Sequence, residues 1–146
     1  MQSVQQTGKM QGQETKIDVS YANGHAKGTA DTPGPGGITH VAVDADVPGG
    51  AIDDNALPVI FPALKWAAGA KFTVPVFQSG KGSLVNLTIA VSGEEPVTVV
   101  AGTFDAWKAD VTGGQAPLTI WIEKAGAHRL LKLALVGQPV EFQLAK

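Results

Sequence analysis

Cysteine is absent from this 146-residue chain. Disulfide bonds, thiolate metal sites and a cysteine nucleophile are therefore excluded. Aromatic residues make up only 6% of the sequence and charged residues 16%, with a formal net charge of −2 and no basic stripe. Nucleic-acid binding needs a phosphate-neutralising surface, so we do not expect a nucleic-acid partner. No run of about 18 apolar residues is present, so we do not expect a chain that spans a membrane.

We do not expect a signal peptide, because the first 13 residues (MQSVQQTGKMQGQ) are polar. This segment resembles the interior of a strand-forming region, and we expect a mature or truncated form. We leave residues 1–14 open between an irregular and an extended conformation.

Alternating apolar and polar residues dominate what is present, together with 18 glycines and 9 prolines. Ile17, Val19 and Tyr21 share one strand face, and the Asn23-Gly24 pair that follows favours a tight hairpin turn. The segment TPGPGG (32–37) is predicted as a loop, and residues 93–96 as a turn. Strand patterns cover residues 15–21, 25–30, 38–47, 72–77, 83–91, 97–100, 104–111, 118–123, 130–136 and 140–144. From these ten segments we expect about nine strands.

One segment departs from this pattern. Residues 56–68 (ALPVIFPALKWAA) are apolar almost all round, and Asp53 or Asp54 can cap a helix there. Pro62 should kink or divide that helix. A helix that is apolar on every side must be covered on every side. We therefore predict a mainly β fold: one domain (1–146) with an antiparallel curved sheet or half-barrel of about nine strands and one apolar helical insert (53–68).

The second half of the chain resembles a known family. The run VTVVAGTFDAWKADV (97–111), then Gly-Gly and PLTIWIEKAGAHRLLKL, is similar to an uncharacterised family of bacterial envelope domains, a domain of unknown function. Its members carry the patterns "paGtFdaykv", "tlWv" and "phRlvk". The segment Asp53 to Gly69 resembles the helical insert of some members, so the resemblance covers roughly residues 50–146.

The resemblance implies an architecture similar to LolA/LppX-like lipoprotein-carrier half-barrels, in which a sheet and helices enclose a lipid-sized apolar cavity. It implies a periplasmic or outer-membrane setting and an apolar ligand. The family provides no catalytic residues to transfer, and we predict no cofactor.

The leading hypothesis is a non-enzymatic module that binds a hydrophobic or lipid-like ligand between the concave sheet and the apolar helix. Trp66 is the aromatic residue that we expect most to contact the ligand, although tryptophans in sheets and helices more often pack in the core. The candidate ligand-binding residues are Leu57, Ile60, Phe61, Leu64, Trp66, Trp107 and Trp121.

Two alternatives stay open. One is a structural or protein-interaction module of an envelope protein, which would pair with a partner or a second copy through its edge strands. The other is a small hydrolase built on His40 or His128, which would need a carboxylate partner in a pocket.

We predict no catalytic residues and no metal site. His40, Asp44 and Asp46 share a strand face, but His40 and Asp44 would lie about 13 Å apart along an extended strand. This distance is too long for shared metal ligation, so a solvated face is the better interpretation. Asp53 and Asp54 are better explained as a helix cap than as a catalytic pair.

Overall fold

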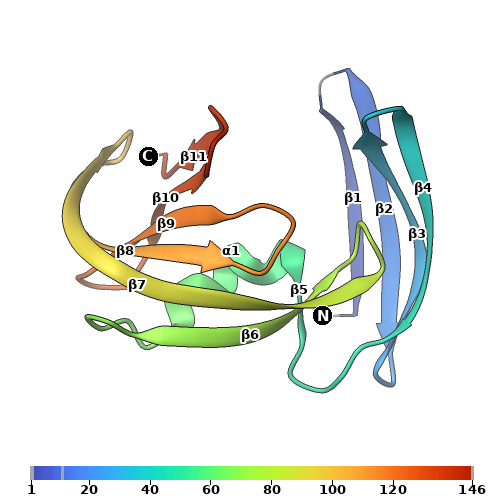
Figure 1. The fold of residues 1–146 in the computed structure, drawn as a ribbon, viewed down its shortest axis with the longest axis horizontal. Helices are drawn as coiled ribbons and strands as arrows, with labels where there is room; N and C mark the ends of the chain where they lie inside the picture. The colour runs from blue at the N-terminus through green and yellow to red at the C-terminus, as the bar shows by residue number, and fades with distance from the viewer. Residues whose placement is uncertain (1, 11, 146) are drawn as a thin grey trace. The chain divides into compact units, whose positions relative to one another are not determined.

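The computed structural model describes residues 2–10 and 12–145. Over these residues the fold is mainly β, with eleven strands in two sheets (Figure 1). The contacts divide the chain into two compact units, one made of residues up to Asn55 with Pro75–Val85, the other of Ala56–Val74 with the chain from Asn86 onward. The prediction of one domain stays a prediction, and each unit is described by itself.

The first unit contains a four-stranded antiparallel sheet in the order β1-β2-β3-β4. Its strands are β1 (Ser3–Met10), β2 (Gln13–Ala22), β3 (His25–Gly34) and β4 (Gly37–Asp46). One face is apolar, because alternate side chains of each strand point to the same side. Its core consists of Val4, Ile17, Val19, Ala26, Ala30, Val43 and Phe77.

The predicted hairpin between β2 and β3 is confirmed. Asn23 and Gly24 both have positive φ, 51° and 74°, as a tight turn of this kind requires. The predicted loop 32–37 is shorter than expected, because β3 continues through Gly34 and β4 begins at Gly37. Pro33 is accommodated there in a regular pair with Ile38. Within residues 1–14, Ser3–Met10 form β1 and β2 begins at Gln13, so most of this segment is extended. Met1 and Gln11 lie outside the described residues.

The other sheet has seven strands in the order β11-β10-β9-β8-β7-β6-β5 and curls into a half-barrel. It is antiparallel except at its end, where β5 runs parallel to β6. The prediction of a curved, mostly antiparallel sheet is thus confirmed in outline, with a different strand count and one parallel pair. The strands are β5 (Ile52–Asp53), β6 (Lys71–Gln78), β7 (Ser83–Val99), β8 (Gly102–Thr112), β9 (Leu118–Glu123), β10 (Leu130–Leu135) and β11 (Glu141–Gln143).

The long strand β7 corrects one sequence prediction. The expected turn at residues 93–96 does not form, and one strand of 17 residues replaces two short ones. The register shifts between Val91 and Gly93, so Ser92 is an extra residue opposite β8 and forms a β-bulge. Such a bulge bends a strand and increases its twist without ending it. Figure 1 shows β7 strongly bent along its length.

The helical segment is shorter than the predicted insert. It consists of η1 (Asp54–Ala56), α1 (Leu57–Ile60) and η2 (Phe61–Ala63), and Leu64 is already extended. Pro62 explains the division, as predicted, because proline has no N–H and its ring clashes with the preceding turn. The expectation that every side would be covered is wrong, since Val59 is 76% exposed whereas Phe61 is 0% exposed. No helix among the described residues has the length and apolar character of a membrane-spanning helix.

Candidate functional site

An apolar groove borders the helical segment in the second unit. Its volume is about 690 Å³, within the range of about 300–1,000 Å³ that is typical of small-molecule sites. Pro58 and Pro62 line it from the helical segment, and β10 and the C-terminal strand β11 line it from the sheet. β10, β11 and the residues next to them contribute Arg129, Leu130, Leu131, Lys132, Leu133, Phe142, Gln143, Leu144 and Ala145.

The wall of the groove formed by β10 and β11 is continuous with the core of this unit. Leu131 is completely buried and belongs to a cluster with Val97, Val99 and Ala106, against which Leu144 packs. Phe142, by contrast, is 65% exposed although it lines the groove. The groove therefore combines a fixed apolar wall with an aromatic side chain that is still accessible to a ligand.

Both cations at the groove have carboxylate partners. Arg129 donates from Nε and Nη2 to the two carboxylate oxygens of Glu123, at 2.7 and 2.9 Å. This pairing raises the pKa of Arg129 and lowers that of Glu123. Lys132 lies 2.7 Å from Glu141, and this contact lowers the pKa of Glu141. Because each positive charge is matched, the groove is electrostatically neutral and its character is set by its apolar side chains.

The seven residues that the sequence indicated do not line this groove. Phe61 is completely buried, and Trp66, 9% exposed, donates from Nε1 to the Phe61 carbonyl at 2.8 Å and packs edge-on against Phe72. Leu57, Ile60 and Leu64 are half-buried. The structure thus places Phe61 and Trp66 within the packing of the helical segment, and Pro58 and Pro62 of the same segment at the groove.

Trp107 and Trp121 lie on the curled sheet and contact lysines. Lys124 Nζ lies 4.5 Å from the centre of the Trp107 ring. Trp121 has Lys132 at 5.2 Å, and its Nε1 donates to Glu95 at 2.7 Å. These contacts fit cation–π packing on a partly solvated sheet face. Neither tryptophan presents its ring to the groove.

Asp53 and Asp54 lie in a partly buried polar cluster of the first unit. Asp53 accepts hydrogen bonds from Tyr21 Oη and from the Asn55 backbone N–H, the latter at 2.8 Å. Asp54 accepts from Ser79 Oγ at 3.2 Å. Burial and then the hydrogen bond to Asp53 raise the pKa of Tyr21, and burial followed by the charge of Asp53 raises that of Asp54. The Asp53–Asn55 contact caps the start of η1. Asp54 contacts Ser79 instead, and α1 itself has no side-chain cap.

The histidines of the first unit contact carboxylates on exposed faces of β3 and β4. His40 contacts neither Asp44 nor Asp46. Its Nδ1 lies 2.7 Å from Oδ1 of Asp31 on β3. Asp44 and Asp46 instead contact His25, a residue beside the hairpin turn that belonged to no predicted cluster. The β3–β4 register decides this pairing, and only the Asn23-Gly24 turn hinted that His25 begins a strand. Nδ1 of His128 contacts the backbone carbonyl of Glu123.

These placements bear on the hydrolase alternative. The contacts of His25 and His40 with carboxylates lie on exposed side chains of β3 and β4. Neither histidine lines the apolar groove. Among the described residues, no group of three or more histidine or carboxylate side chains is arranged to hold a metal ion.

The comparison with protein families assigns the chain over almost its whole length. Residues 2–139 match the family described as protein of unknown function (DUF3108). No curated protein and no solved structure matches the chain. The match includes β1 to β10 and the whole helical segment, and thus all of the groove except its β11 side. The chain therefore belongs to the DUF3108 family.

Proposed function

We propose that this protein is a non-enzymatic binding module that holds a hydrophobic, lipid-like ligand in the groove between the helical segment and strands β10 and β11. The observation that supports the proposal is the volume of about 690 Å³ with a mainly apolar lining. An acyl chain placed there would cover exposed apolar surface, such as the ring of Phe142. Burial of apolar surface contributes about 25 cal/mol for each Å² removed from water.

The charges around the groove favour an apolar chain as the part of the ligand that is bound. Arg129 and Lys132 are engaged by Glu123 and Glu141. A ligand charge would have to displace one of these pairs, at the cost of leaving a carboxylate without its partner. An apolar chain leaves both pairs intact.

The sequence resemblance, which implies a LolA/LppX-like half-barrel with an apolar cavity, supports the same proposal. It extends the proposal to a periplasmic or outer-membrane location. In that setting, a protein that shields an acyl chain from water could accept lipid from a membrane surface without a catalytic step.

A fluorescent fatty acid that brightens on leaving water tests the proposal. We expect saturable binding to the unaltered chain and binding about tenfold weaker or worse for Phe142→Asp, because a carboxylate would then face the acyl chain. Phe142 is already 65% exposed, so this variant should fold. Mass spectrometry of an organic extract of the purified protein would identify a ligand carried from the cell.

Val136→Asp is the matched control for Phe142→Asp. Val136 is also an exposed apolar residue near the C-terminus, 53% exposed, but it does not line the groove. We expect this variant to bind the probe like the unaltered chain. Equal binding by all three proteins, or no saturable binding at all, would refute the groove as the ligand site.

A second candidate function is a protein-interaction module, and the edge strand β1 favours it. Strand β1 pairs with β2 only, and Lys9 is the one charged residue among Ser3–Met10. A long edge with few charges presents unpaired backbone groups to another strand. Light scattering over a range of concentrations tests this function, since a strict monomer at high concentration would argue against self-association through β1.

A further inference from the structure

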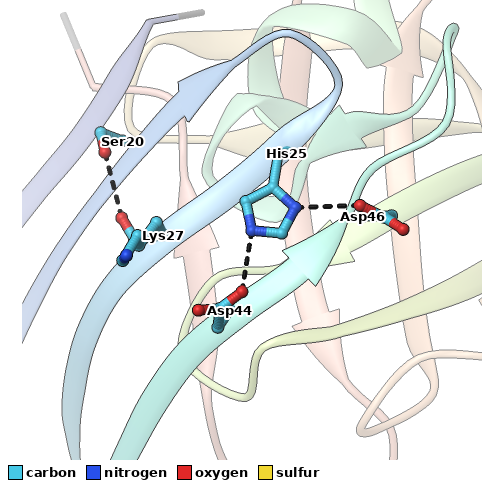
Figure 2. Close-up of polar contacts among 5 residues, drawn as sticks. All are labelled: Ser20, His25, Lys27, Asp44 and Asp46. Carbon is cyan, nitrogen blue, oxygen red and sulfur yellow. Dashed lines mark hydrogen bonds and ion pairs between the residues drawn. The ribbon is translucent and has the colours of Figure 1, made fainter.

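His25 begins β3 and lies between two carboxylates of the neighbouring strand β4. Its Nδ1 is 2.9 Å from Asp46 Oδ1, and its Nε2 is 2.8 Å from Asp44 Oδ1. Figure 2 shows the imidazole ring placed between the two aspartates, with one ring nitrogen directed at each. The three side chains share one face of the sheet, because His25 is paired with Asp46 and Lys27 with Asp44.

This geometry requires a particular protonation state. A neutral imidazole has one N–H donor and one nitrogen that can only accept, whereas an imidazolium donates from both nitrogens. An ionised carboxylate only accepts hydrogen bonds. Both contacts of His25 are therefore hydrogen bonds only when the ring is protonated. After loss of the proton, one nitrogen lone pair would face a carboxylate oxygen.

The other neighbours of His25 do not fully balance the negative charge of Asp44 and Asp46. On β2, Ala22 lies opposite His25, and the next position on this face is Ser20, which donates to the Lys27 carbonyl at 3.1 Å (Figure 2). Neither β2 residue is ionisable. Lys27, two residues further along β3, is the nearest cation on this face by register. Asp18 is the next residue beyond Ser20, away from His25, on the same face of β2. The hydrogen bond to Asp46, followed by that to Asp44, raises the pKa of His25.

We propose that protonation of His25 controls how firmly the start of β3 is joined to the end of β4. The backbone hydrogen bond from Val47 N–H to the Gly24 carbonyl, at 2.7 Å, lies directly beyond this contact. This hydrogen bond joins the residue that follows β4 to the β2–β3 turn, and Pro48 comes directly after it. Loss of the His25 proton removes a hydrogen bond and leaves two carboxylates beside each other, so this end of the sheet opens more easily.

The direction of the pH effect follows from the direction of the pKa shift. The pKa of His25 is higher in the folded chain than in the unfolded chain, where histidine titrates near about 6.5. Proton binding therefore favours the folded arrangement. The added stability is fully present below the unfolded pKa and is lost as the pH rises through the folded pKa of His25.

Two NMR measurements test the proposal on the intact chain. The first is the titration of the His25 ring, whose pKa we expect to lie above about 6.5 and to fall towards that value in the Asp44→Asn, Asp46→Asn double variant. The second is hydrogen exchange of the Val47 amide, corrected for its intrinsic pH dependence. We expect its protection to decrease as the pH rises through the His25 titration.

Two single variants separate the role of His25 from that of the sheet as a whole. In His25→Gln the protection of Val47 should no longer depend on pH, because glutamine does not titrate. His40→Gln is the matched control. His40 also makes a contact between β3 and β4, but with one carboxylate, that of Asp31. In that variant the pH dependence at Val47 should persist. A His25 pKa at or below about 6.5, or the same pH dependence in His25→Gln, would overturn the proposal.

Discussion

Replacing Phe61 with alanine is expected to lower the free energy of unfolding by about 3–5 kcal/mol. Phe61 is 0% exposed and is one of the largest fully buried side chains of the chain. Its removal leaves a cavity that the surrounding backbone can close only in part, since the Phe61 carbonyl is held by both Trp66 Nε1 and the Leu64 N–H. Urea unfolding followed by tryptophan fluorescence measures the loss.

Val59→Ala provides the control for Phe61→Ala. Val59 lies two residues away in the same helical segment but is 76% exposed, so we expect a change within about 0.5 kcal/mol. This pair also separates packing from ligand binding. If Phe61→Ala left stability nearly unchanged and abolished binding of the fatty-acid probe, Phe61 would be a ligand contact and not a core residue.

Gly28→Ala is expected to destabilise the four-stranded sheet by about 1–3 kcal/mol. Gly28 lies in the middle of β3, paired with Val19 on β2 and Val43 on β4. A Cβ atom at this position would lie 2.0 Å from the Asp18 carbonyl oxygen and 2.8 Å from Val19 Cα. Both are backbone atoms, so β2 and β3 would have to separate locally. The free energy of unfolding from urea titration measures the effect.

The matched control for Gly28→Ala is Gly8→Ala in β1 of the same sheet. A Cβ atom at Gly8 has no heavy atom within 4 Å. Alanine also restricts the unfolded chain more than glycine, so we expect unchanged stability or a gain of up to about 1 kcal/mol. Equal effects of the two substitutions would show that the close approach of β2 and β3 at Gly28 is not maintained in solution.

Local patterns predicted the regular strands well. The alternation of Ile17, Val19 and Tyr21 and the Asn23-Gly24 turn identified the β2–β3 hairpin, and Leu118–Glu123 was predicted with the bounds of β9. Strand periodicity and turn chemistry depend on residues that are neighbours in sequence, so they can be recognised without the rest of the fold.

Predictions were wrong where strand pairing or packing in the folded chain overrode a local sequence pattern. The Gly93–Pro96 segment resembles a turn, but pairing with β8 on both sides of Ser92 keeps β7 extended through it. The apolar pattern of residues 56–68 indicated a helix covered on all sides, yet Pro62 divides it and only Phe61 and Trp66 become buried. Local propensity is a weak prior that long-range pairing and packing override.

The candidate groove could not be predicted from the sequence for a related reason. Its walls come from Pro58 and Pro62 and from residues 129–133 and 142–145, which are far apart along the chain. Their side chains are ordinary apolar residues with no motif that marks a site. The pairing of His25 with Asp44 and Asp46 is similar, since a shift of β4 by one residue would place different side chains opposite His25.

By itself, then, the amino-acid sequence determined a mainly β, cysteine-free chain, the position of most strands and the interruption of the helical segment at Pro62. Tertiary structure alone decided the division into two sheets, the unbroken course of β7, the apolar groove and the partners of each histidine. The reason is physical: alternation and turn preferences act between neighbours in the chain, whereas register and packing arise from contacts between residues that only folding brings together.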